Sequence, residues 1–264
     1  MLRLNDVSYS YDKKTFINHM NLTVKSGKIT ALIGRNGCGK STVLKLCTRL
    51  LTPDEGQVYL DGIPVETMNP KVFARNVSVL LQNSEIPDMT VEQAVLSARF
   101  PYWSPFGGPS TEDRDRMEDA LTASGCLSLR YQNMYRVSGG ERQRAYLAMI
   151  LAQNTPYLFL DEPTTYLDLN VSHEMIKQIY ELNRKFGKTV VMVLHDINLA
   201  LNYTDYILLL EKGSVAAYKP TADPQLLRRI SDLFQINIKD LSENNRKTYF
   251  FTLKYEETNP CKNY

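Results

Sequence analysis

The first part of the chain combines short alternating segments with one continuous apolar run. Residues 7–11 and 20–24 alternate apolar and polar side chains, which is typical of strands with one buried face. Residues 29–33 (ITALI) are apolar except for Thr30 and predict a buried strand, followed by a glycine-rich loop and a helical pattern from 40 to about 50. Residues 57–60, which end in Asp61-Gly62, indicate a hairpin strand. This part predicts a strand-rich layer around one strand–loop–helix unit.

The second half of the chain alternates helical and strand patterns. Helices are predicted over 138–153 and 171–186, and apolar strands over 157–160, 189–194 and 206–210. Apolar strands that alternate with helices are typical of a parallel sheet covered on both faces. The predicted fold class is therefore α/β, with a parallel-sheet core and an antiparallel β layer.

Two further segments complete the predicted organisation. From about residue 83 to 125, prolines and the pair Gly107-Gly108 interrupt two helical patterns, at 91–99 and 111–123. The end of the chain predicts a helix over 224–234 and strands over 236–240 and 248–255, joined by a turn at 242–245. We expect a single domain over 1–264, with a core and β layer (1–82 and 154–221), a helical subdomain (about 83–153) and a helix-hairpin tail (222–264).

Composition and charge exclude several classes of protein. A formal net charge of +2 over 264 residues leaves no broad basic surface for nucleic acid. The longest apolar run, residues 145–152, is shorter than the about 20 residues that a membrane-crossing helix needs. The polar N-terminus is unlike a secretory signal, and the four cysteines, among them Cys38 and Cys261, have no CxxC spacing. We expect a soluble cytosolic protein with reduced thiols.

One loop carries a specific chemical signal. Residues 34–41 (GRNGCGKS) match GxxxxGK[ST] at each fixed position, between an apolar strand and a helix. Glycines there let backbone N–H groups converge on phosphate oxygens, and the helix N-terminus adds its positive dipole end. We expect Lys40 to reach the β- and γ-phosphates and the Ser41 hydroxyl to bind Mg²⁺, while Cys38 fits as a small residue. The alternative is a glycine-rich turn that binds nothing, and the strand–loop–helix context argues against it.

Polar side chains follow three of the other predicted strands. Asp161 and Glu162 end the strand at 157–160, at the edge where α/β sheets bind ligands. Asp161 is placed to hold Mg²⁺, and Glu162 to polarise a water that attacks the γ-phosphate. His195 follows the strand at 189–194 and is a candidate to contact the γ-phosphate, and Gln82 follows a strand-like run at 77–81 and could hold Mg²⁺ or the water. A solvated acidic turn and a structural histidine are the alternatives.

A second glycine motif opens the helix at residue 138. Ser138 and Glu141 fit an S-x-x-E capping box, which explains the start of the helix without a ligand. Gly139 and Gly140 are poor helix formers, however, and in a first turn they leave bare backbone N–H groups that suit an anion.

These motifs, in this order and with Asp168, resemble the nucleotide-binding subunits of ATP-binding-cassette (ABC) transporters over essentially the whole chain. The resemblance implies a P-loop NTPase cassette with a RecA-like core, an antiparallel β layer and a helical subdomain. It also implies hydrolysis of ATP with Mg²⁺. Two copies are expected to meet head to tail, so that each ATP lies between the phosphate loop of one and the Ser138-Gly139-Gly140 helix of the other.

The resemblance also implies roles for single residues. Tyr11 corresponds to an aromatic that stacks on adenine, and Asp168 to a residue that couples the two copies. The catalytic residues implied are Glu162, His195 and Gln82, and the magnesium ligands are Ser41, Gln82 and Asp161. Nucleotide contacts are implied for Tyr11, Asn36, Gly37, Cys38, Gly39, Lys40, Ser41, Thr42, Ser138, Gly139, Gly140 and Asp168. The chain departs from the family pattern at Val137, where leucine is usual, and at Glu141, where glutamine is usual.

Within the family, residues 142–152, 164–169 and 194–200 resemble the importers of ferric siderophores and related iron chelates, with cobalamin and haem importers as alternatives. The implied partners are a second copy, membrane permease subunits and, indirectly, an extracytoplasmic binding protein, with no nucleic acid. The chain would then lie at the cytoplasmic face of the membrane. Residues 83–108, rich in proline and aromatics, form either the permease-docking surface or an ordinary loop of the helical subdomain.

Two other functions remain as alternatives. A non-transport ABC ATPase would act on nucleic acid or ribosomes, but a single cassette with near-neutral charge argues against it. A cassette that no longer hydrolyses ATP is disfavoured by the presence of both Glu162 and His195.

Overall fold

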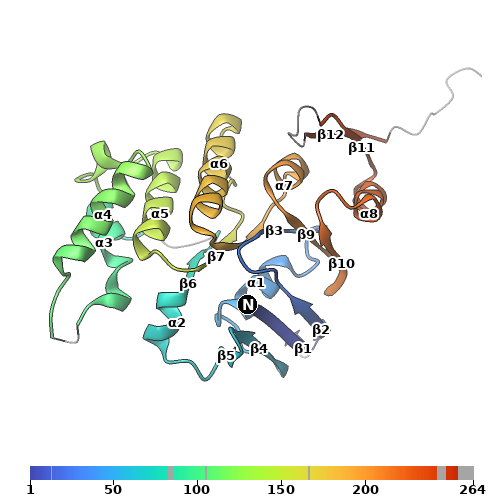
Figure 1. The fold of residues 1–264 in the computed structure, drawn as a ribbon, viewed down its shortest axis with the longest axis horizontal. Helices are drawn as coiled ribbons and strands as arrows, with labels where there is room; N and C mark the ends of the chain where they lie inside the picture. The colour runs from blue at the N-terminus through green and yellow to red at the C-terminus, as the bar shows by residue number, and fades with distance from the viewer. Residues whose placement is uncertain (13, 83–85, 105, 166, 243–247, 255–264) are drawn as a thin grey trace, which may run out of the picture.

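The computed structural model describes residues 1–12, 14–82, 86–104, 106–165, 167–242 and 248–254 (Figure 1). Its antiparallel sheet has the strand order β2-β1-β4-β5. The strands are β1 (Leu2–Tyr11), β2 (Lys14–Thr23), β4 (Glu55–Leu60) and β5 (Ile63–Pro64). β1 begins earlier than its alternating segment predicts, because Leu2 and Leu4 are buried and pair with β4. The expected antiparallel β layer is confirmed.

A six-stranded sheet forms the centre of the molecule, in the order β10-β9-β3-β8-β7-β6. Its strands are β3 (Ile29–Ile33), β6 (Val77–Leu80), β7 (Tyr157–Asp161), β8 (Thr189–Val193), β9 (Tyr206–Glu211) and β10 (Ser214–Pro220). All neighbours pair in parallel except β10, which is antiparallel to β9. β3, β7 and β8 are buried along their whole length, as continuous apolar runs predict. The α/β fold class is confirmed.

Helices pack on both faces of this sheet. Side chains of α1 (Lys40–Cys47) join the apolar cluster between the two sheets. Side chains of α6 (Leu169–Phe186), α7 (Ile197–Tyr203) and α8 (Pro224–Phe234) join the cluster on the other face. The C-terminal hairpin, β11 (Ile236–Asp240) and β12 (Tyr249–Leu253), adds Ile236 and Tyr249 to that second cluster. The predicted turn at 242–245, apart from Ser242, and Cys261 lie outside the described residues.

Three helices have an apolar core of their own. α3 (Val91–Ser97), α4 (Thr111–Ala123) and α5 (Gly139–Gln153) share a cluster that includes Val95, Leu121 and Ala148. Two short 3₁₀ helices, Phe100–Tyr102 and Leu127–Leu129, lie in the same region of the chain. Figure 1 shows α3, α4 and α5 together at one end of the molecule. The division of the chain into the subdomains given above stays a prediction.

The sequence pattern missed four elements: α2 (Pro70–Asn76), α7, β5 and β10. With seven residues each, α2 and α7 are too short for a helical period to stand out. β10 lies at the edge of its sheet and its residues are mostly half-buried, so it shows neither a continuous apolar run nor a clear alternation.

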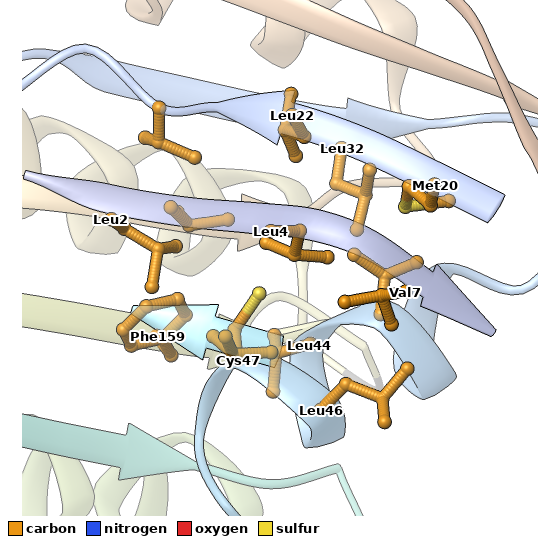
Figure 2. Close-up of a cluster of buried hydrophobic side chains, with 14 of the residues drawn as sticks. Leu2, Leu4, Val7, Met20, Leu22, Leu32, Leu44, Leu46, Cys47 and Phe159 are labelled. Atoms are coloured by element: carbon orange, nitrogen blue, oxygen red, sulfur yellow. The ribbon is translucent and has the colours of Figure 1, made fainter. Parts of the chain in front are cut away.

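The cluster between the two sheets fixes the helix that follows the phosphate loop (Figure 2). Leu44 and Leu46 of α1 share this cluster with Leu4 of β1 and Phe159 of β7, and all four side chains are 0% or 1% exposed. Because interiors are close-packed, α1 has no room to shift relative to either sheet.

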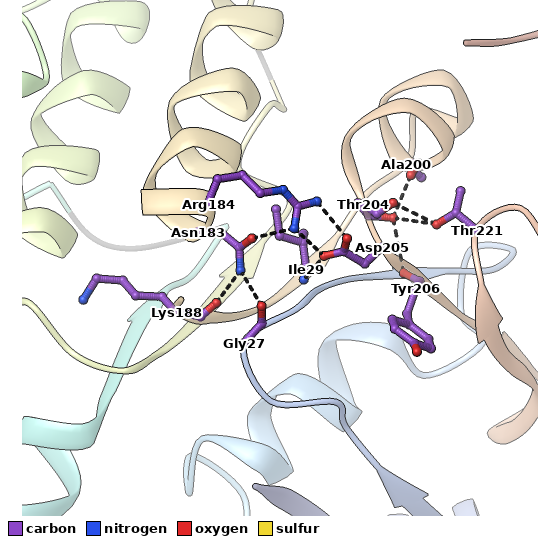
Figure 3. Close-up of polar contacts among 10 residues, drawn as sticks. All are labelled: Gly27, Ile29, Asn183, Arg184, Lys188, Ala200, Thr204, Asp205, Tyr206 and Thr221. Carbon is purple, nitrogen blue, oxygen red and sulfur yellow. Dashed lines mark hydrogen bonds and ion pairs between the residues drawn. The ribbon is translucent and has the colours of Figure 1, made fainter. Parts of the chain in front are cut away.

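A polar network ties α6 to the amino ends of the parallel strands (Figure 3). The Asn183 side chain is buried and its Nδ2 donates to the carbonyl oxygens of Gly27 at 3.1 Å and Lys188 at 2.5 Å. The neighbouring Arg184 pairs with Asp205 at 2.7 Å, and Asp205 also accepts from the backbone N–H of Ile29.

Among the described residues, every helix is too short or too polar to cross a membrane.

We predict that Asn183→Ala lowers the free energy of unfolding by about 1–3 kcal/mol, because the buried Lys188 carbonyl and the part-buried Gly27 carbonyl lose their donor. Lys177→Ala is the matched control on the same helix: its exposed ion pair with Glu181 should contribute less than about 1 kcal/mol. Urea unfolding followed by circular dichroism measures both values. Equal losses for the two variants would contradict the importance of the buried amide.

Candidate functional site

The phosphate loop lies between β3 and α1 and needs its glycines. Gly39 caps α1 in a left-handed conformation, with φ at 108°, and an added Cβ would lie 3.0 Å from the Ile17 side chain. At Gly34 an added Cβ would lie 2.4 Å from the Leu210 carbonyl oxygen. A side chain at either position would be strained or would clash, so the loop can follow this path only with glycine there.

Lys40 is held inside this loop. Its Nζ donates to the carbonyl oxygens of Gly34 at 3.0 Å and Arg35 at 3.2 Å, and the residue is 6% exposed. The ammonium group therefore has neutral oxygen partners, and its charge stays available to an anion in the loop.

Asp161 faces the loop from the end of β7. Its Oδ1 accepts a hydrogen bond of 3.1 Å from the Ser41 hydroxyl. Burial raises the pKa of the Asp161 carboxyl, and the Ser41 hydrogen bond opposes that shift. The pair brings one hydroxyl oxygen and one carboxylate oxygen together beside the phosphate loop.

Glu162 is the meeting point of three other side chains. Its backbone has a positive φ of 53°, which turns the chain sharply after β7. Its carboxylate contacts Gln82 Nε2 and His195 Nε2, and accepts from the Thr165 hydroxyl at 3.0 Å. The Glu162 side chain is 12% exposed, whereas that of His195 is 45% exposed.

A pocket of about 410 Å³ brings most of the predicted residues together. It is lined by Phe16, Asn36, Gly37, Gly39, Lys40, Ser41, Thr42, Gln82, Glu162 and His195. Tyr11 is not among the lining residues: its ring packs edge-on against Phe16, and its hydroxyl lies 3.4 Å from Thr42 Oγ1. Sequence reasoning missed Phe16, and its place near the start of a strand gave no signal for a site.

Cys38 also lies away from the pocket lining. It is 6% exposed, and burial raises the pKa of its thiol. The structure places this cysteine as a small packed residue of the loop, and its role as a nucleotide contact stays a prediction.

The second glycine motif lies outside this pocket. Ser138, exposed at the start of α5, forms a capping box with Glu141 in which its hydroxyl donates to Glu141 Oε2 at 2.8 Å. An added Cβ on Gly139 would meet no atom within 4 Å, so packing does not explain this glycine. Asp168, at the start of α6, is also exposed. The structure therefore does not bring these residues to the phosphate loop of the same chain.

The fold and the loop together define a P-loop nucleoside triphosphatase. Residues 17–165 match the family model described as ABC transporter. The chain is 39% identical over 233 residues to the petrobactin import ATP-binding protein FpuD of Bacillus anthracis, covering 87% of this chain and 85% of that protein. It is 37% identical over 243 residues to the iron(3+)-hydroxamate import ATP-binding protein FhuC of Bacillus subtilis (strain 168), covering 92% and 90%.

A solved structure agrees with these relatives. It is a dimeric ATP-binding cassette in a post-hydrolysis state bound to ADP and Pi, with a TM-score of 0.74 and 29% identity, covering 84% of this chain and 100% of that one. The chain therefore belongs to the ABC transporter family, and it is an ATP-binding ATPase.

We predict that Tyr11→Ala raises the KM for ATP about tenfold with little change in kcat, because a base–aromatic stack would be lost. Tyr11→Phe keeps the ring and removes the hydroxyl with its contacts to Thr42 and Tyr9, so its KM should stay within about twofold of wild type. Steady-state release of phosphate at varied ATP gives both constants. An unchanged KM in Tyr11→Ala would remove Tyr11 from the adenine site.

Proposed function

We propose that this chain is the ATP-hydrolysing subunit of an importer that takes up ferric siderophores or another iron chelate. Two relatives that align with at least 87% of the chain are named for import, one of petrobactin and one of iron(3+)-hydroxamate. The resemblance of residues 142–152, 164–169 and 194–200 to iron-chelate importers supports the same cargo class.

The observation that supports an ATPase built from two copies of this chain is the separation of the two glycine motifs. Residues of the phosphate loop, Glu162 and His195 line the pocket, whereas Gly139 at the tip of α5 is exposed, Gly140 is half-buried, and neither lines it. A helix tip with bare N–H groups suits an anion. A second copy, placed head to tail, would supply that tip to the γ-phosphate and would bring Asp168 to the contact between the copies.

Mg²⁺ fits the oxygen donors beside the loop. Among the described residues, no group of three or more His, Cys, Asp and Glu could hold a metal ion by itself. Mg²⁺ is usually bound by one or two protein oxygens together with substrate phosphates, and Ser41 and Asp161 offer such a pair. With Gln82, these residues would hold the ion, which neutralises charge on the phosphates when bound.

The catalytic roles follow from the contacts of Glu162. Its carboxylate would orient and polarise the attacking water, while His195 would contact the γ-phosphate from the neighbouring strand end. Gln82 shares the Glu162 carboxylate, so it is placed to respond when the γ-phosphate arrives or leaves.

The membrane partners would be two permease subunits, to which an extracytoplasmic binding protein delivers the chelate. The chain would lie at the cytoplasmic face of the membrane, held there by the permease. Within residues 83–108, the exposed side chains of Phe100 and Phe106 support a docking surface for the permease.

We predict that Glu162→Gln lowers ATP turnover by about 10²–10⁴-fold, because the water loses its general base while the phosphate loop stays intact. The variant should form a dimer on gel filtration with ATP and Mg²⁺ and return to a monomer without ATP. Lys40→Ala is the control that should neither bind ATP tightly nor dimerise. Turnover at the wild-type rate in Glu162→Gln would contradict the role of this carboxylate.

The proposed cargo can be tested by uptake measurements in cells that lack this chain and carry its permease. Uptake of radiolabelled ferric siderophore should return with the wild-type chain and stay at background with Glu162→Gln. Labelled cobalamin and haem, offered to the same cells, test the alternative importers. Restored uptake of either of these, without the ferric siderophore, would overturn the iron proposal.

A further inference from the structure

The tip of α5 and the turn that holds Glu162 are joined by one hydrogen bond within the chain. Gln143 lies one helical turn after Gly139, and its Nε2 donates to the carbonyl oxygen of Pro163 at 2.6 Å. Pro163 directly follows Glu162. The bond therefore links the first turns of the diglycine helix to the backbone beside the catalytic carboxylate.

The turn that receives this bond is shaped to place a carboxylate. Glu162 has a positive φ, and Pro163 is buried. The backbone N–H of Thr165 donates to the Glu162 carbonyl oxygen at 3.2 Å, and the Thr165 hydroxyl donates to the Glu162 carboxylate. Thr165 thus stabilises the turn through hydrogen bonds within it, and Gln143 of α5 adds a hydrogen bond from a neighbouring helix.

The start of α5 packs against the start of α6. Side chains of α5, among them Gln143 and Leu147, line a small shared pocket with side chains of α6, among them Val171. An added Cβ on Gly140 would lie 3.8 Å from Val171. The first turn of α5 and the start of α6 are therefore neighbours, on the side of α5 from which Gln143 contacts the acidic turn.

A second glutamine ties the other end of α5 to the core. Gln153 Nε2 donates to the carbonyl oxygens of Ala74 at 2.8 Å and Val77 at 3.2 Å. Gln143 and Gln153 lie on the same helix, and each uses its side-chain amide to donate to backbone carbonyl oxygens. Of the two side chains, Gln143 is the one that lies beside the acidic turn. This pair provides an internal control.

We propose that Gln143 is a positioning residue that couples the place of the diglycine tip to the orientation of the Glu162 carboxylate. This inference rests on the proposed head-to-tail dimer. In that dimer the tip of one copy binds the ATP held by its partner. Binding of ATP at the partner's site then sets, through Gln143, the orientation of the Glu162 carboxylate at this copy's own site.

The test compares full-length wild type with Gln143→Met, which keeps the length of the side chain but removes the donor. The expected result is a fall in kcat of about tenfold, the effect of one lost hydrogen bond, with the KM for ATP within about twofold. Gln143→Ala should lose no more than this. The phosphate loop is untouched, so equilibrium binding of ATP should not change.

The matched control is Gln153→Met, which removes the donor at the far end of α5. It should lower the melting temperature and leave kcat within about twofold of wild type. Three results would overturn the inference: wild-type kcat in Gln143→Met, a smaller loss in Gln143→Met than in Gln143→Ala, or an equal loss in Gln153→Met. If the dimer proposal alone is wrong, Glu162→Gln stays monomeric with ATP, whereas failure of the Gln143 inference leaves that dimer intact.

Discussion

Parallel pairing of the central strands is the constraint on which the site depends. β3, β8 and β7 pair in one continuous register, and β6 adds to β7, so their carboxyl ends meet at a single edge. The phosphate loop follows β3, His195 follows β8 and Gln82 follows β6. Asp161 is the last residue of β7, and Glu162 comes directly after it. A slip of one residue in a strand would exchange its two faces, and both faces of β3, β7 and β8 are buried by different apolar clusters. The packing of apolar side chains therefore fixes where the polar ones meet.

The electrostatics of this edge suit a ligand with many negative charges and a cation. Lys40 is nearly buried and donates to two carbonyl oxygens of its own loop, while burial raises the pKa of Asp161. Buried charges with incomplete compensation cost free energy, which a phosphate and a magnesium ion would recover when they bind. The strained turn at Glu162 adds to the same cost and is held by its hydrogen bonds.

Sequence reasoning found the parts of this site that one segment specifies. The GxxxxGK[ST] loop and the carboxylates after an apolar strand each combine a strong local pattern with a required backbone context, so their place in the fold could be predicted. Phe16 and Gln143 could not be found in this way, because their neighbours are distant in the chain and their own segments read as ordinary strand and helix. The short helices α2 and α7 and the edge strand β10 were missed because none of them is long or apolar enough to show a period of its own, although Asn69 caps α2 and Asp196 caps α7.

The capping box at the tip of α5 sets a condition on closing of the proposed dimer. In the single chain, Ser138 exchanges hydrogen bonds with Glu141, and the Ser138 backbone N–H and hydroxyl lower the pKa of the Glu141 carboxyl, which keeps it charged. A phosphate that takes over the Ser138 hydroxyl must break part of this cap. It must also approach the Glu141 carboxylate, at a position where the family usually has a neutral glutamine. The Ser138 side chain at the tip therefore has hydrogen-bond partners even when no nucleotide is bound. Two copies should then hold together weakly until a triphosphate with its magnesium ion offers enough favourable interaction to displace Glu141.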